Sequence, residues 1–172
     1  AQSIGIMPPI PPIDEVAPAP NVKDRLTITD TNLSLVVINV RQSLDAIINK
    51  AQELGGYMVN SNLSAPEDAP FATVTLRVPS NKREEALSSF RALAYKVTSE
   101  NVVGHDVTDE YVDIDAQLAI LGETKVKFES ILKQAVAIDD ILRVQQEIIS
   151  IQSQIDNLKG RQNYLKQNAD LS

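Results

Sequence analysis

The only histidine of the chain, His105, begins the one stretch whose residue types suggest metal chemistry. Four carboxylates follow it closely: Asp106, Asp109, Glu110 and Asp113. An imidazole beside carboxylates can bind a divalent cation, and on a helix Asp109 and Asp113 would share one face. The same residues also fit a helix start, in which Asp106 or Thr108 is the N-cap and the other carboxylates lie at the positive end of the helix dipole. We expect the capping role, and a metal-dependent enzyme that uses His105 is the distant alternative.

Other arrangements for catalysis are missing from the sequence. There is no cysteine and no second histidine, which removes thiol nucleophiles, thiolate metal sites and Ser-His-Asp triads. The sequence also lacks a Gly-rich phosphate loop, a Gly-x-Ser-x-Gly elbow and a His-Glu-x-x-His helix. Arg77 could bind an anion, but a surface ion pair is its expected role. We therefore predict a protein that is not an enzyme, with no cofactor and no small-molecule substrate.

Composition and charge narrow the choice of partners. The chain has 172 residues and a net charge of -7, with a pI near 4.7, so it offers no basic surface to nucleic acid or anionic lipid. No apolar run reaches the ~18 residues of a transmembrane helix, so any membrane anchor must lie outside these residues. The chain starts Ala1-Gln2-Ser3 without an initiator Met, as it would after signal-peptide removal or in an excised fragment. We expect an exported, extracytoplasmic protein, periplasmic or on the cell surface, processed before Ala1.

Residues 1–22 form a proline-rich arm that contains six of the nine prolines. Such a composition predicts an extended polyproline segment that forms neither a helix nor a central strand. The arm is either a spacer or a contact to a neighbouring subunit. The second interpretation is suggested by apolar residues that a solvated linker does not need: Ile4, Ile6, Met7, Ile10 and Ile13.

Residues 23–107 have the pattern of a small α+β domain. The predicted elements are a strand at 26–38 with a bulge near 30–32, a helix from Asn39 to Gly55, strands at 57–63 and 71–78, a helix from Pro79, and a strand at 96–107. Asn39 precedes Gln42 by three residues, as in a capping box, and glycines end the first helix. The order βαββαβ predicts a ferredoxin-like sandwich, in which two helices cover one face of a four-stranded antiparallel sheet.

Residues 108–167 carry the most regular pattern, a heptad repeat that predicts a long antiparallel coiled-coil hairpin. Its seam has one charged member, Lys125, and residues 168–172 are expected to begin a return strand or a tail. The apolar seam positions are Tyr111, Ile114, Leu118, Leu121, Phe128 and Leu132 in the first helix, and Ile141, Val144, Ile148, Ile151, Ile155, Leu158 and Leu165 in the second.

Four apolar residues of the hairpin fall outside the seam and gather towards its distal half: Ile131, Ile138, Leu142 and Ile149. A two-stranded hairpin needs apolar residues only at its seam. Our hypothesis is that these residues contact a second copy or another protein in a four-helix arrangement. The alternative is a broadened seam in a twisted hairpin.

Five segments in order resemble one protein family. They are Gly55-Gly56-Tyr57, Leu76-Arg77-Val78-Pro79, Asp106-Val107-Thr108-Asp109-Glu110-Tyr111-Val112-Asp113, Val144-Gln145-Gln146-Glu147 and Leu158-Lys159-Gly160-Arg161. Together they resemble the bacterial domain-of-unknown-function family 4349 (DUF4349), over about residues 25 to 172. The resemblance implies an exported domain without established enzymatic activity. It also implies an N-terminal lipid or membrane tether, and usually a further strand and a transmembrane helix after the hairpin.

The chain departs from this family pattern at three places. Ala94-Tyr95 stands where a Gly is usual before the fourth strand, there is no N-terminal Cys, and the sequence ends at Leu171-Ser172, where the closing strand of the family would begin. We predict an extracytoplasmic structural or interaction module that acts through its hairpin and arm and self-assembles. An adaptor or sensor domain of a membrane-anchored envelope complex is the alternative.

Overall fold

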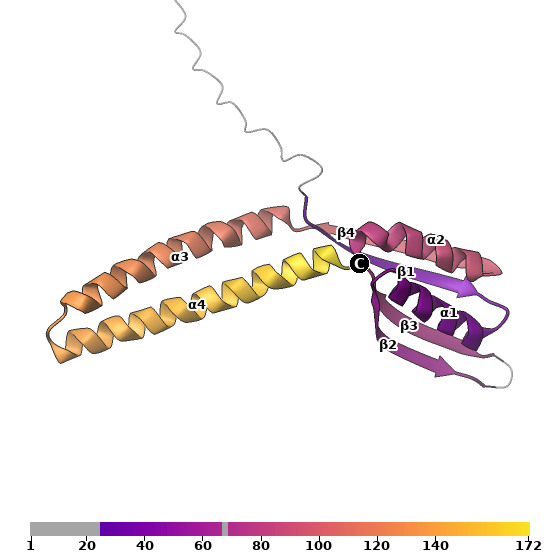
Figure 1. Cartoon of the computed structure of the whole chain (residues 1–172), viewed down its shortest axis with the longest axis horizontal. Helices are drawn as coiled ribbons and strands as arrows, with labels where there is room; N and C mark the ends of the chain where they lie inside the picture. Colours follow the sequence, from indigo (N-terminus) through magenta and orange to yellow (C-terminus); the bar gives the residue numbers. More distant parts are fainter. Residues whose placement is uncertain (1–24, 67–68) are drawn as a thin grey trace, which may run out of the picture.

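The computed structural model describes residues 25–66 and 69–172. Within them the fold is α+β, with four α-helices and two antiparallel sheets of two strands each (Figure 1). The predicted α+β class is confirmed. The single four-stranded sheet is not found, because β1 pairs with β4 and β2 pairs with β3, with no ladder joining the two pairs in the described residues.

The first sheet joins β1 (Thr27–Val36) to β4 (Lys96–Asp106). The bulge predicted near 30–32 is wrong, since the pairing is continuous from Thr27 to Ser34 and shifts only between Ser34 and Leu35. The extra residue lies in β4, where Thr98 has no partner in the register. The apparent slip in the sequence arises because threonines occupy inner positions of β1, and Thr29 is buried.

Helix α1 (Val40–Glu53) begins and ends as the sequence predicts. The side chain of its N-cap, Asn39, accepts a hydrogen bond of 3.0 Å from the Gln42 N–H. At its end, Gly55 has a positive φ of 83° and donates to the Gln52 carbonyl, while Gly56 donates to the Ala51 carbonyl. These two bonds make a Schellman motif, which stops the helix and turns the chain into β2.

The second sheet joins β2 (Tyr57–Ser64) to β3 (Phe71–Arg77). A short 3-10 turn, η2 (Ser80–Lys82), then leads into α2 (Arg83–Leu93). Along β3 the exposed residues alternate with half-buried ones, as predicted for a strand with one covered face. Helices α1 and α2 supply that cover, since their buried residues form one core with the ends of β1 and β3. The core comprises Ala51, Val78, Ala86, Leu87 and Phe90, with Leu33, Leu35, Ile47, Leu54 and Leu76 packed against it.

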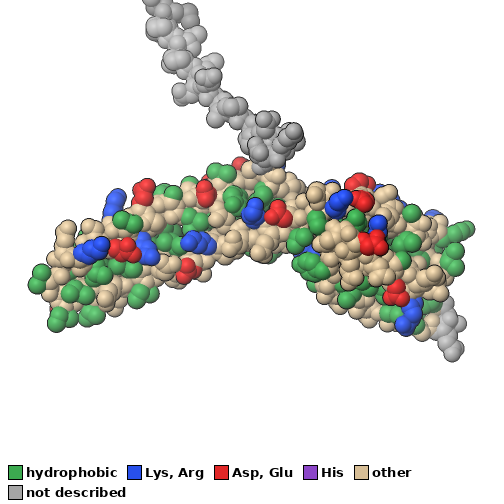
Figure 2. Space-filling model, viewed as in Figure 1, with side chains coloured by type: hydrophobic (Ala, Val, Ile, Leu, Met, Phe, Trp, Pro, Cys, Tyr) green, Lys and Arg blue, Asp and Glu red, His purple; other side chains and the backbone are tan. Residues whose placement is uncertain are grey.

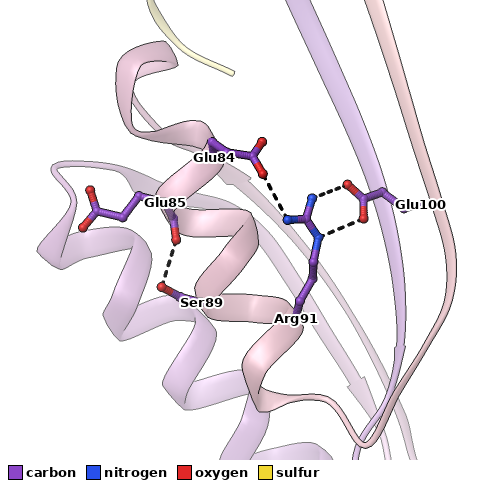
Figure 3. A network of polar contacts seen from close by, with 5 residues as sticks. All are labelled: Glu84, Glu85, Ser89, Arg91 and Glu100. Atoms are coloured by element: carbon purple, nitrogen blue, oxygen red, sulfur yellow. Dashed lines mark hydrogen bonds and ion pairs between the residues drawn. The ribbon is translucent and has the colours of Figure 1, made fainter.

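A polar network fastens α2 to β4 (Figure 3). The guanidinium of Arg91 donates to both carboxylate oxygens of Glu100, at 3.0 Å and 2.5 Å, and to Glu84 at 3.1 Å. This planar, two-bond contact holds the pKa of the Glu100 carboxyl below its usual value and raises that of Arg91. It ties the second helix to the first sheet.

Two long helices leave the α/β domain side by side, α3 (Thr108–Gln134) and α4 (Ile138–Asp170) (Figure 1). Only residues 135–137 separate them, so the helices run antiparallel. Their base is attached to β1 through Val107, Ile114 and Leu165, against which Leu26 and Ile28 pack. Helix α4 continues to Asp170, three residues beyond the predicted end of the hairpin, and Leu171 then forms an antiparallel bridge with Pro79.

Candidate interaction surface

The predicted seam residues lie on the facing sides of α3 and α4, and each of them is buried or half-buried. Ile114, Ile151, Ile155 and Leu165 are buried. The half-buried members are Tyr111, Leu118, Leu121, Phe128 and Leu132 in α3, and Ile141, Val144, Ile148 and Leu158 in α4. Burial is most complete near the base and in the middle of α4, and it decreases towards the tip.

Polar contacts also cross between the two helices. The Lys125 ammonium, the charged member of the seam, donates to the Gln152 side chain at 2.7 Å. Nearer the base, Arg161 donates to Glu110 at 2.6 Å, and Gln162 donates to Asp115 at 3.2 Å. Lys125 therefore serves as a cross-helix hydrogen-bond donor and leaves no buried unpaired charge in the seam.

The four off-seam residues are exposed. The exposed fraction is 50% for Ile131, 74% for Ile138, 53% for Leu142 and 68% for Ile149. Ile138, Leu142 and Ile149 are spaced four and seven residues apart on α4, which places them along one side of the helix. Figure 2 shows hydrophobic side chains gathered at the distal end of the helix pair, where Val136 is 91% exposed. We call Ile131, Ile138, Leu142 and Ile149 the distal flank.

His105 and the carboxylates that follow it lie where β4 passes into α3. His105 is exposed near the end of β4, and no group of three or more metal-binding side chains occurs in residues 25–66 and 69–172. Asp106 accepts hydrogen bonds from the Thr108 hydroxyl (2.6 Å) and the Thr108 N–H (3.0 Å), which lower the pKa of its carboxyl. The N-cap of α3 is Val107, whose side chain makes no capping hydrogen bond. The predicted N-caps, Asp106 and Thr108, are each one residue away from it.

The arm residues proposed as contacts lie outside the described residues: Ile4, Ile6, Met7, Ile10 and Ile13. The sequence also missed one feature altogether, a cavity of about 490 Å³ between the two sheets. Consecutive residues of β1 and of β3 line it, together with Arg83 and Ser172. Arg77, expected as a surface ion pair, is half-buried at its wall and forms no salt bridge with the described residues.

A family model described as "Domain of unknown function (DUF4349)" matches residues 25–172. The chain belongs to this family. No curated protein and no solved structure gives a significant match to this DUF4349 domain. Among the described residues of the domain, no helix combines the length and the apolar character that crossing a bilayer requires.

Proposed function

We propose that this DUF4349 domain is a non-enzymatic, extracytoplasmic interaction module that self-assembles through the distal flank of its helical hairpin. The observation that carries the proposal is the exposure of Ile138, Leu142 and Ile149 along one side of α4. Scattered apolar residues are common on protein surfaces, but three exposed apolar residues aligned on one side of a helix favour a partner. The domain acts through this contact and uses no cofactor, nucleic acid or small-molecule substrate.

The proposal also covers the architecture of the α/β domain and of the helix pair. The α/β domain is a ferredoxin-like sandwich opened between β1 and β3, since its two strand pairs are the outer pairs of that fold. Helices α3 and α4 pack as a coiled coil, supported by buried or half-buried residues at alternating spacings of three and four. A rigid coiled coil holds the distal flank away from the α/β domain.

The distribution of charge along the chain favours a second copy as the partner that covers the distal flank. Residues 120–150, which surround the distal flank, carry four basic and five acidic side chains, a net charge of -1, although the whole chain carries -7. Two copies that met through their tips would therefore keep most of their negative charge apart. Side-by-side contact of two hairpins would bury both flanks in a four-helix arrangement with a two-fold axis.

Light scattering on the double variant Leu142→Asp with Ile149→Asp tests the proposal. Two charges on the flank would have to be buried in the assembly, so we expect the molar mass to fall to that of one chain. Ser150→Asp with Asn157→Asp is the matched control, because it adds the same charge at the same spacing on exposed positions of α4 away from the stripe. An unchanged mass in the flank variant, or equal loss in both variants, would contradict self-assembly through the flank.

Export and the role of the arm belong to the proposal as well. An N-terminal arm rich in proline is suited to a spacer between an envelope anchor and the domain. Fusion of the natural gene product to a reporter enzyme that is active only outside the cytoplasm tests the location. We expect an active reporter, and an inactive one would place the domain in the cytoplasm.

An adaptor or sensor domain of a membrane-anchored complex is the second candidate function. The exposed distal flank favours this function if a different protein, and not a second copy, covers the flank. Electron microscopy of the purified protein separates the two. Assemblies of several copies without any other component support self-assembly, whereas isolated single chains support the adaptor.

A further inference from the structure

The end of the α/β domain that points away from the helix pair is formed in part by two neighbouring turns (Figure 1). One turn joins β1 to α1 at residues 37–39, and the other joins α2 to β4 at residues 94–95. The turns lie side by side, because the Tyr95 N–H donates to the Val36 carbonyl at 2.8 Å and Val36 pairs with Lys96. Residues far apart in the sequence therefore share this surface.

Five apolar side chains are exposed at these two turns. The exposed fraction is 93% for Ile38 and 80% for Tyr95, and it lies between 38% and 45% for the other three. Figure 2 shows hydrophobic side chains that project at this end of the α/β domain. We call the five residues the apolar end: Val36, Ile38, Leu93, Tyr95 and Val97.

Packing within the domain does not explain the two most exposed members. Ile38 directly precedes Asn39, the N-cap of α1, and an apolar residue at that position often packs against the fourth residue of the helix. In α1 the fourth residue is Ser43, whose side chain is polar. Tyr95 directly precedes β4, and its exposure shows that neither α1 nor α2 covers it. A contact outside the chain is the better explanation for both residues.

The charge at this end is opposite in sign to that of the whole chain. Residues 36–41 and 93–97 contain two basic side chains, Arg41 and Lys96, and no acidic one, whereas the chain carries -7. Both basic side chains are exposed, and neither forms a salt bridge with another described residue. The next acidic residue along α1 is Asp45, one turn further from this end. The two turns therefore favour an anionic partner.

The surface of a lipid bilayer fits this combination of side chains. Isoleucine and tyrosine at the tips of turns can enter the headgroup region, where the tyrosine hydroxyl stays in water. A second copy is a poorer partner, because two basic ends would face each other. Strands β2 and β3 also meet at this end (Figure 1), but the turn between them includes Glu67 and Asp68, which lie outside the described residues. The proposed surface does not include that turn.

We infer that the apolar end rests on a bilayer surface that contains anionic lipid, with Ile38 and Tyr95 inserted between the headgroups and Arg41 and Lys96 beside the phosphates. The helix pair leaves the opposite end of the α/β domain (Figure 1), so a bound molecule would hold the distal flank away from the bilayer. The 27 residues of α3 alone extend about 40 Å. The contact does not depend on self-assembly through the distal flank.

Single tryptophans test the contact, because the chain contains no tryptophan of its own. Tyr95→Trp places the reporter in the apolar end, and Tyr164→Trp is the matched control on α4, where Tyr164 is 53% exposed. Each full-length variant is mixed with vesicles of phosphatidylcholine and anionic phosphatidylglycerol that carry bromine on their acyl chains. We expect the fluorescence of the reporter at position 95 to shift to shorter wavelength and to be quenched, and that at position 164 to stay unchanged.

The role of the inserted side chain is tested in the Tyr95→Trp background. Ile38→Asp should weaken vesicle binding by about tenfold or more, since it removes an inserted apolar side chain and adds a negative charge. Ile120→Asp makes the same change at an isoleucine that is 64% exposed on α3, and it should leave binding nearly unchanged. Circular dichroism checks that both variants fold.

The role of the basic side chains is tested by Arg41→Gln with Lys96→Gln. This double variant should bind the mixed vesicles about tenfold more weakly or worse, and its binding to pure phosphatidylcholine should not change. Lys127→Gln with Lys133→Gln removes the same charge at exposed positions of α3 and is the matched control. It should bind the mixed vesicles nearly as well as the native chain.

Three results would overturn the inference. No quenching at position 95 by the mixed vesicles would mean that the apolar end does not contact lipid. Equal quenching at positions 95 and 164, or equal loss of binding in Ile38→Asp and Ile120→Asp, would mean adsorption through other surfaces. A shift to shorter wavelength at position 95 that grows with protein concentration in the absence of vesicles would mean that a second copy covers the apolar end.

Discussion

Glycines at four positions show how much the surroundings of a single residue matter in this protein. Gly55 and Gly56 are required by the end of α1, since a Cβ on Gly56 would collide with the Arg77 carbonyl. Gly122 and Gly160 lie inside the long helices, and apart from the neighbouring residues and backbone of its own helix, a Cβ at either would meet no atom of the described residues within 4 Å. Close packing therefore does not require a glycine at either of these two helix positions.

Gly122→Ala and Gly160→Ala should therefore each stabilise the protein. Alanine restricts the unfolded chain and is favoured in a helix by about 1 kcal/mol over glycine. Urea denaturation of each variant measures the change. Gly56→Ala serves as the contrast and should destabilise by roughly 1–3 kcal/mol, because the collision forces the backbone to shift. Destabilisation by Gly122→Ala would mean that the helices approach more closely there.

Arg91 controls the acidity of Glu100 through the paired hydrogen bonds in Figure 3. Arg91→Lys keeps the charge but loses the two-bond geometry, so the pKa of Glu100 should rise towards its ordinary value. NMR titration of the side-chain carboxyl carbons measures this. Glu85, whose lowered pKa depends chiefly on Lys82, is the internal control and should not move.

The same contact between Arg91 and Glu100 determines in which direction stability changes with pH. Because the folded-state pKa of Glu100 is lowered, the contact stabilises the fold above the unfolded-state pKa and stops doing so as the pH falls through the lowered value. The stability difference between the native protein and Arg91→Lys should shrink in acid. A difference that stays constant down to the acid transition would contradict the role of the Glu100 carboxylate.

At the scale of elements, the base of the helix pair is the joint between the two parts of the molecule. Leu165 is the most buried large side chain there, with 1% exposed, and it packs with Val107 and Ile114. Leu165→Ala should cost about 2–5 kcal/mol of unfolding free energy, since the cavity it leaves is enclosed by both parts. Chemical denaturation measures the loss.

Val126→Ala is the matched control for this joint. Val126 is exposed on α3, so the substitution removes methyl groups without leaving a cavity. Its effect should stay within about 0.5 kcal/mol. Equal effects of the two substitutions would show that Leu165 does not hold the helices to the α/β domain.

At the scale of the whole molecule, the proposed self-assembly through the distal flank would make stability depend on protein concentration. Association stabilises the folded state by mass action, so the midpoint of thermal unfolding should rise by about 3 °C or more across a hundredfold increase in concentration. Leu142→Asp with Ile149→Asp should remove this dependence, and Ser150→Asp with Asn157→Asp should keep it. Calorimetry at several concentrations measures the effect, and a midpoint independent of concentration in the native protein argues for a single chain.

The sequence by itself determined the features that local patterns encode. Asn39 at the start of α1, the glycines at its end and the alternation along β3 place these elements, because caps, turns and side-chain periods depend on neighbours in the chain. The spacing of apolar residues likewise predicts the two long helices, and five short segments point to the family that matches residues 25–172.

Only the tertiary structure decided how the strands are joined. The order of elements predicted one sheet, but β1 and β3 are separated, and Ser172 pairs with Val78 directly after β3. Pairing between distant strands depends on main-chain groups that every residue carries, so side-chain periodicity cannot specify which edges meet. For the same reason the phase of β1 was misjudged, since its inner threonines became buried only through contacts that lie far away in the sequence.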